Sequence, residues 1–149
     1  MKLTRLARFT GCFVNLGFYL GILICAAVPL IIWKAGDWFP IFRDYYWPMV
    51  IIFLLSGILG VLIFYELKKI FGTLAARDPF VEANVLSLRR MGAYSFSICV
   101  VTAARLFFNI TVTMLILILV FFIAGLFSLV LSQVFTQAVL YKQENDLTV

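Results

Sequence analysis

Four long apolar blocks constrain this chain more than any other feature of its sequence. They cover residues 12–33, 47–65, 91–109 and 114–135. A helix rises about 1.5 Å per residue, so about 20 apolar residues cross a hydrocarbon core about 30 Å thick. The sequence therefore predicts an all-α, polytopic membrane protein whose four transmembrane helices form two antiparallel hairpins packed as a bundle. We expect residues 1–149 to form a single integral membrane domain.

The composition is typical of a membrane protein. Hydrophobic residues make up 64% of the chain and charged residues 13%, whereas soluble domains are about 45–50% apolar and about 25% charged. The net charge of +5 does not indicate nucleic-acid binding, because the positive residues lie at the ends of the apolar blocks. We expect membrane lipid to surround the chain and no direct contact with nucleic acid.

The distribution of Lys and Arg predicts the orientation of the chain. With the N-terminus inside, two positive residues face outward, Lys34 and Arg43. Nine face inward: Lys2, Arg5, Arg8, Lys68, Lys69, Arg77, Arg89, Arg90 and Lys142. Positive residues favour the cytoplasmic side of a membrane. We therefore expect a multi-pass cell-membrane protein with both termini, the connector at residues 66–90 and the tail at residues 139–149 in the cytoplasm.

The residue types present argue against catalysis. The chain has no histidine, which excludes Ser-His and Cys-His catalysis and histidine-ligated metal sites within it. Its three cysteines, Cys12, Cys25 and Cys99, form no C-x-x-C pair and are typical of buried small hydrophobic residues. We expect no enzyme activity, no cofactor and no metal.

Small residues recur on the predicted spans. Gly17 and Gly21 flatten one face of the first span and allow another helix to approach closely. This face suits packing within the bundle, and it also suits a homo-oligomer. Two further sets of small residues are typical of packing stripes: Ser56, Gly57 and Gly60 on the second span, and Gly125, Ser128 and Ser132 on the fourth.

The connector carries the most specific local pattern. Leu67, Ile70, Phe71 and Leu74 follow helical spacing, so the helix of the second span is predicted to continue into the connector. Asp78-Pro79 is a helix start signal, an N-cap residue followed by proline at N1. It predicts a new helix from Pro79 through Arg90 into the third span. Phe80, Asn84 and Leu88 would then share one helical face.

These residues carry a resemblance to a known family. The connector motif, Asp-Pro-Phe followed by Asn84 and Leu88-Arg89-Arg90, stands together with an end that reads Glu-Asn-Asp-Leu-Thr-Val. The chain resembles an uncharacterised bacterial membrane family, domain of unknown function 2975, whose members have four predicted spans, a Pro-Phe-x-x-x-Asn-x-x-x-Leu-Arg connector and a similar acidic end. Asp78 stands where members often have a small residue before the proline. Genes of this family often neighbour small helix-turn-helix regulators, so the resemblance implies a membrane partner for a transcription regulator.

The leading functional hypothesis is a non-enzymatic regulatory or interaction module. It would dock a cytoplasmic protein partner, such as a helix-turn-helix transcription regulator, through the connector and the tail. An extended Leu-Thr-Val end would add to a sheet edge of the partner or present its carboxylate. The candidate partner-binding residues are Asp78, Pro79, Phe80, Asn84, Arg89, Arg90, Glu144, Asn145, Asp146, Leu147, Thr148 and Val149. Helix capping for the connector and disorder for the tail are the simpler interpretations.

The alternative is a membrane ligand-binding or antimicrobial-peptide immunity protein. Its outer aromatic groove would be lined by Trp38, Phe39, Tyr46 and Arg105. From Met91, Arg105 lies about 21 Å along the axis of the third span, and a charge at that depth either snorkels to the outer headgroups or lines a polar cavity. No acidic residue lies within a predicted span to pair with it.

Overall fold

The computed structural model describes residues 2–148, with side chains from Arg5 onward, and the described chain is almost entirely helical. The elements are α1 (Lys2–Ala35), α2 (Pro40–Asp44), α3 (Tyr46–Ala75), α4 (Glu82–Ala104), the 3-10 turn η1 (Arg105–Phe107) and α5 (Val112–Leu147). No strand occurs between residues 2 and 148. The all-α prediction is confirmed.

Three helices are long and apolar enough to cross a membrane. They are residues Arg5–Ala35 of α1, all of α3 and all of α5, and they indicate a multi-pass membrane protein. α4 is not among them, because Glu82, Arg89 and Arg90 lower its hydropathy, together with the uncharged polar residues Asn84, Ser87, Ser95 and Thr102. These four uncharged side chains are buried in the fold.

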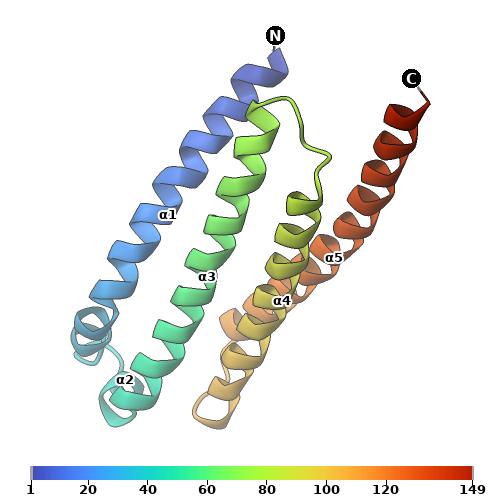
Figure 1. The fold of residues 1–149 in the computed structure, drawn as a ribbon. Coiled ribbons are helices and arrows are strands. Elements are labelled where there is room, and N and C mark those ends of the chain that lie inside the picture. The colour runs from blue at the N-terminus through green and yellow to red at the C-terminus, as the bar shows by residue number, and fades with distance from the viewer. Residues whose placement is uncertain (1, 149) are drawn as a thin grey trace.

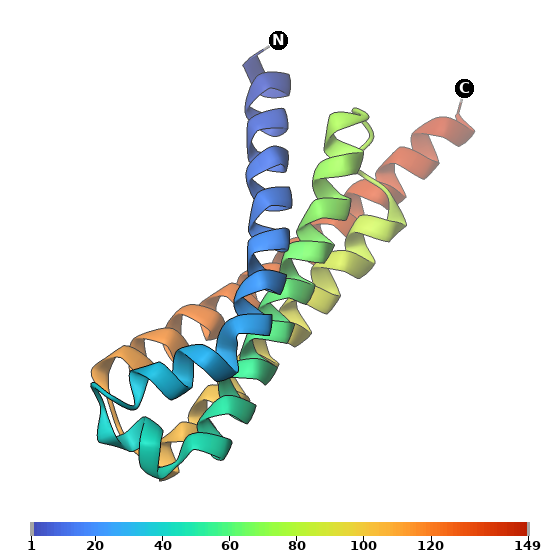
Figure 2. The same ribbon diagram turned by 90° about the vertical axis from the view of Figure 1, so that its left-hand side faces the viewer.

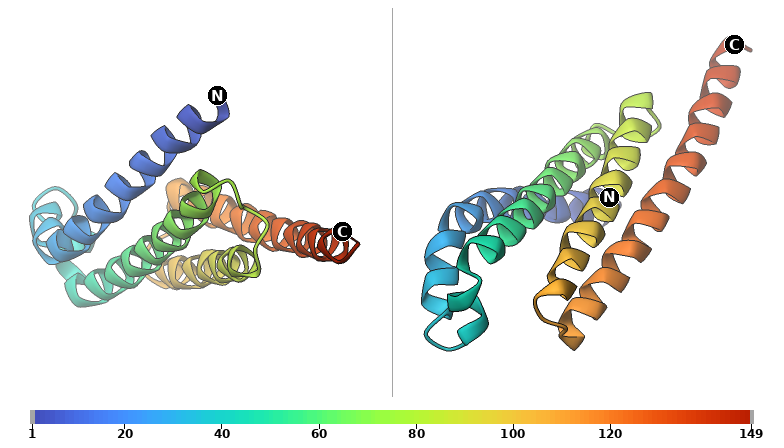
Figure 3. Two further views of the ribbon diagram at one scale, coloured as in Figure 1. Left: turned by 45° about the horizontal axis from the view of Figure 1, so that its top comes forward. Right: turned by 90° about the horizontal axis from the view of Figure 1, so that it is seen from below.

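The long helices pack in chain order, with α1 along α3, α3 against α4 and α4 along α5 (Figure 1). Both ends of the described chain lie at the same end of the molecule as the connector between α3 and α4, whereas α2 and η1 lie at the opposite end. The rotated view in Figure 2 shows that α1 is bent. Pro29 lies inside this helix and removes the N–H that would bond to the Cys25 carbonyl, which is a common cause of bending. Figure 3 shows α1 and α5 diverging from the central helices.

Glycines set how closely the helices approach, as the small-residue pattern predicts. A Cβ added at Gly17 would lie 2.7 Å from the Phe64 ring, and one at Gly57 would lie 2.7 Å from the Cys25 sulfur. On the other pair of helices, a Cβ at Gly92 would lie 2.9 Å from the Leu129 side chain. The stripe at Gly125, Ser128 and Ser132 is buried. The predicted packing roles are confirmed for Gly17, Gly57 and the stripe on α5, but not for Gly60, where an added Cβ would meet nothing within 4 Å.

Several predicted boundaries are corrected. α3 continues through the first part of the connector to Ala75, as the amphipathic spacing predicts. α4, however, begins at Glu82 rather than at Pro79, and it ends at Ala104 rather than at residue 109. α5 continues to Leu147, so the described part of the predicted tail is helical as far as Leu147. The reason is that Lys, Gln and Glu at residues 142–144 are strong helix formers.

The close packing at Gly92 is testable by a matched pair of substitutions. We expect Gly92→Leu to destabilise the fold by about 1–3 kcal/mol, because the new side chain overlaps Leu129 and approaches the backbone oxygen of Gly125. Gly72→Leu is the control, since nothing lies within 4 Å of a Cβ built there. Thermal unfolding in detergent measures both variants. Equal stability of the two variants would contradict the packing of α4 on α5.

Candidate functional site

The candidate site lies at the end of the molecule that holds the connector, and it begins where α3 ends. The N–H of Asp78 donates to the Thr73 carbonyl at 3.1 Å, and the N–H of Arg77 donates to the Leu74 carbonyl at 3.1 Å. These two bonds form a Schellman motif. Arg77 occupies its left-handed position with φ 62°, the only positive φ of a non-glycine among residues 2–148. Glycine normally fills this position because it has no Cβ to clash.

The Asn84 side chain fixes the path of the connector. Its amide nitrogen donates to the Thr73 hydroxyl at 2.6 Å and to the Pro79 carbonyl at 2.7 Å, and Asn84 is only 1% exposed. Thr73 in turn donates to the Ile70 carbonyl at 2.8 Å. One buried amide therefore joins the end of α3, the connector and the first turn of α4. We call this set, Thr73, Pro79 and Asn84, the Asn84 clamp.

The predicted helix start at Asp78-Pro79 is wrong, because both residues belong to the connector. Val81 is the N-cap residue of α4, with φ −125° and ψ 150°, so residues before it belong to the connector. The backbone of Asp78 completes the Schellman motif, and the Pro79 carbonyl accepts from Asn84. The Asp78 side chain does not cap α4 and is free to meet another helix.

That other helix is α5. Lys142 donates a hydrogen bond to Asp78 and forms an ion pair with it. The Phe80 ring packs against the Phe135 ring, with 5.5 Å between their centroids. The ion-pair side chains are 43% and 55% exposed, so the pair contributes at most about 1 kcal/mol to stability. Its main consequence is positional, because it holds the last turns of α5 beside the connector.

A buried carboxylate joins α3 to α4 at the same end. The Glu66 side chain is 3% exposed. It forms ion pairs with Lys69 at 2.8 Å and with Arg90 at 3.6 Å. Burying a carboxylate is costly unless cations compensate it. Arg90 therefore serves first as a partner of Glu66 across the α3–α4 interface.

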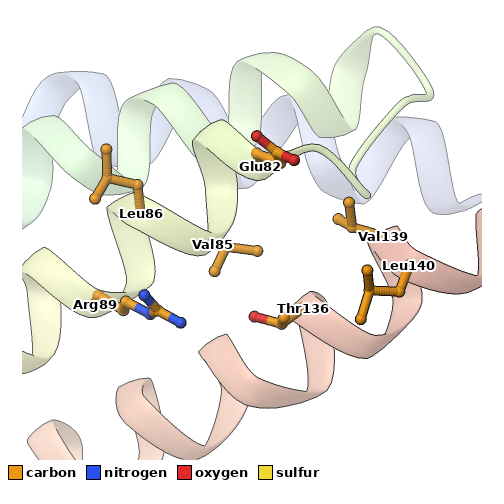
Figure 4. Close-up of a pocket in the computed structure, with 7 residues that line it drawn as sticks. All are labelled: Glu82, Val85, Leu86, Arg89, Thr136, Val139 and Leu140. Atoms are coloured by element: carbon orange, nitrogen blue, oxygen red, sulfur yellow. The ribbon is translucent and has the colours of Figure 1, made fainter. Parts of the chain in front are cut away.

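A groove opens between α4 and α5 beside the clamp (Figure 4). Its volume is about 270 Å³, and it is lined by Glu82, Val85, Leu86, Arg89, Thr136, Val139 and Leu140. We call it the connector groove. In Figure 4, Glu82 and Arg89 lie at different ends of the α4 wall with Val85 between them, and Thr136, Val139 and Leu140 line the facing wall on α5. The groove thus combines an apolar floor with one charge of each sign.

A second hollow of about 230 Å³ continues this surface toward the chain end. Its lining includes Phe80, Glu82, Val139, Lys142 and Asp146. Glu82 and Val139 line both hollows. The connector and the end of α5 therefore form one continuous surface.

The candidate partner-binding residues have different positions in this surface. Phe80, Arg89 and Asp146 line the two hollows, whereas Asn84 is buried and holds the connector. Asp78 and Pro79 are engaged by Lys142 and Asn84, and Arg90 by Glu66. Glu144, Asn145 and Leu147 are exposed on the last turns of α5, and Thr148 is the C-cap. Val149 lies outside the described residues.

The alternative outer residues do not share one cavity. Trp38 and Phe39 are 81% and 59% exposed. Tyr46 donates to the Pro29 carbonyl at 3.1 Å and lines a hollow with Trp33, Asp37 and Arg43. Arg105 lines a different cavity between the helices. Arg105 therefore lines a different cavity from Tyr46, although its partner Phe53 packs against the Phe42 ring of the loop.

Sequence reasoning did not identify several residues of the site. Thr73, Glu66 and Lys142 contact residues that are 11, 24 and 64 positions away in the sequence, and no local pattern pairs them. The groove residues on α5 belong to an apolar face that continues beyond the predicted fourth span. A signal was present for Glu66, which begins the connector at the end of an apolar block.

The Asn84 clamp predicts a position-specific loss of stability. We expect Asn84→Asp to destabilise the fold by about 1–3 kcal/mol, because the isosteric carboxylate loses both buried N–H donors and faces the Pro79 carbonyl. Asn109→Asp is the matched control on an exposed residue. Chemical unfolding in detergent measures both variants, and an equally small effect at the two positions would contradict the clamp.

Comparison with known proteins identifies a family only. Residues 30–149 match the family model described as "Protein of unknown function (DUF2975)". No curated protein and no solved structure matches the chain. The family model covers the connector, the candidate docking surface and α5, which together carry the motifs named above. The chain therefore belongs to the DUF2975 family.

Proposed function

We propose that the protein is a non-enzymatic regulatory module of the cell membrane. It crosses the membrane four times as two antiparallel hairpins, and both termini are cytoplasmic. It docks a cytoplasmic protein partner, such as a helix-turn-helix transcription regulator, on the surface formed by the connector and the end of α5.

The shape and packing of α4 support a fourth span. Its 23 residues extend about 35 Å at 1.5 Å per residue. The turns from Glu82 to Arg90 lie at the cytoplasmic surface, and the uncharged segment from Met91 to Ala104 enters the hydrocarbon core and continues through η1 toward the outer face. Its polar side chains Asn84, Ser87, Ser95 and Thr102 are all buried against other helices. Polar residues on a span are tolerated when they face the protein interior. Low hydropathy therefore does not prevent α4 from crossing.

The arrangement of the chain supports the orientation. Four crossings return the chain to its starting side, and both described ends lie at the connector end of the molecule (Figure 1). This end also carries most of the positive charge, including Lys68, Lys69, Arg77 and Lys142. Positive residues favour the cytoplasmic side.

The observation that carries the docking proposal is the continuity of the two hollows. They share Glu82 and Val139, and the Asn84 clamp and the Asp78–Lys142 pair hold their walls in place. A preformed surface loses less conformational entropy on binding than a mobile one. The connector groove is therefore suited to a protein partner.

The charges define the chemistry of that partner. Glu82 and Arg89 are seven residues apart on α4, which is about 10 Å along its axis. An amphipathic helix fits this spacing when it presents a basic residue to Glu82, an apolar residue to Val85 and Leu140, and an acidic residue to Arg89. Helix-turn-helix proteins consist of short amphipathic helices, which agrees with such a partner.

Photocrosslinking in host cells tests the docking surface. A photoreactive amino acid at Leu140 faces the connector groove, whereas one at the neighbouring Tyr141, 70% exposed, is the matched control because Tyr141 lines neither hollow. We expect the probe at Leu140 to give one dominant adduct with a cytoplasmic helix-turn-helix protein. We expect the charge reversal Glu82→Lys to reduce that adduct several-fold.

Two further variants separate the parts of the surface. A chain that ends at Gln143 lacks Asp146 and keeps the connector groove, so an unchanged adduct would remove the tail from the docking surface. Adducts at Leu140 with lipid only, or with a second copy of the chain only, would contradict docking of a cytoplasmic protein.

A further inference from the structure

A cavity of about 300 Å³ lies between the helices, away from the connector groove. α1 contributes the turn before Pro29, including Cys25, and α3 contributes the segment from Phe53 to Gly60. Residues of α4, η1 and α5 complete the wall, among them Thr102 and Arg105. The volume is at the lower end of the range for small-molecule sites, about 300–1,000 Å³.

Arg105 is the one charged residue in the lining of this cavity. Its guanidinium carbon lies 4.7 Å from the centre of the Phe53 ring. Its Nε is buried and has no hydrogen-bond partner. None of the ion pairs in the described part of the chain includes Arg105.

This environment lacks an anion. The Phe53 ring contributes a cation–π contact, but a guanidinium has five N–H donors and prefers a carboxylate or phosphate, which it binds with two parallel hydrogen bonds. A cation in apolar surroundings is costly without such a partner. An anionic group from outside the chain would supply an acceptor for the guanidinium, whose buried Nε has none.

The rest of the cavity lining indicates which chemical group is attached to the anion of the ligand. The other lining residues are apolar apart from Ser56 and Thr102. Phe53 and Gly60 are seven residues apart, so the α3 wall extends about 10 Å away from the level of Phe53. A Cβ built at Gly60 meets no atom within 4 Å, so this wall borders open space at Gly60. An apolar chain fits this extended space.

We propose that this cavity binds an anionic amphiphile, with its carboxylate or phosphate on Arg105 and its apolar chain along α3 toward Gly60. The chemistry is shared by a free fatty carboxylate and by the acidic headgroup and one chain of a phospholipid. The site is independent of the proposed docking surface, because it shares no lining residue with the connector groove.

Binding of defined probes to the full chain tests this assignment. The chain is purified in uncharged detergent, and the probes are decanoate, decanol and, in nanodiscs, phosphatidylglycerol against phosphatidylcholine. Native mass spectrometry gives the number of bound molecules, and titration gives the dissociation constant. We expect one bound anion per chain and at least about 10-fold weaker binding of the uncharged decanol or the zwitterionic lipid.

Two variants assign the binding to the cavity. Arg105→Gln should weaken the anion about 10- to 100-fold, whereas Arg43→Gln, at an arginine outside this cavity, should leave binding unchanged. Gly60→Leu places its side chain in open space and should weaken decanoate and decanol alike by filling the chain end. If Arg105→Gln weakens the binding of decanoate, the ligand is a free carboxylate. If it weakens the binding of phosphatidylglycerol alone, the ligand is a phospholipid. Both outcomes support the proposal. Anion binding that is unaffected by Arg105→Gln, or absent for every probe, would overturn it.

Discussion

The two hydrogen bonds donated by the Asn84 amide determine the geometry of the connector end. They join Thr73 at the end of α3 to the Pro79 carbonyl and to the first turn of α4. A buried amide without partners would be costly, so the clamp admits few other paths for the connector. Once the path is set, Phe80 meets Phe135 and Asp78 meets Lys142. The position of α5 beside α4 at this end follows from these contacts.

Helix α4 contributes lining residues to both the connector groove and the cavity that contains Arg105. α4 lines the connector groove with Val85 and Arg89, and it lines the opposite cavity with Ile98 and Thr102. Four of its uncharged polar side chains, Asn84, Ser87, Ser95 and Thr102, are buried, while its neighbours expose apolar side chains. α4 is therefore the element whose sequence is least typical of a membrane span and whose packing matters most for the two sites.

The fold class, the extension of α3 and most packing roles of the small residues were predictable from the sequence, because they follow from local composition and helical spacing. The motif residues Pro79, Phe80 and Asn84 could also be singled out from the sequence. Their roles were not predictable, because Asp78-Pro79 has the same pattern as a helix start. Only the structure shows that α3 ends in a Schellman motif at Arg77 and that α4 begins after its N-cap Val81. The partners Lys142 and Phe135 lie more than fifty residues further along the chain. The helical end of α5 was missed because its polar residues indicated a tail, although several are strong helix formers.

The central claim is that the connector end is cytoplasmic and that α4 crosses the membrane, which places Ile110 on the outer side. Cysteine accessibility tests it directly, in a chain whose native Cys12, Cys25 and Cys99 are replaced by alanine. An impermeant maleimide should label Trp38→Cys and Ile110→Cys in intact cells, whereas Arg77→Cys and Leu147→Cys should react only after permeabilisation. All four positions are exposed in the fold. Labelling of Arg77→Cys in intact cells, or of Ile110→Cys only after permeabilisation, would contradict the claim.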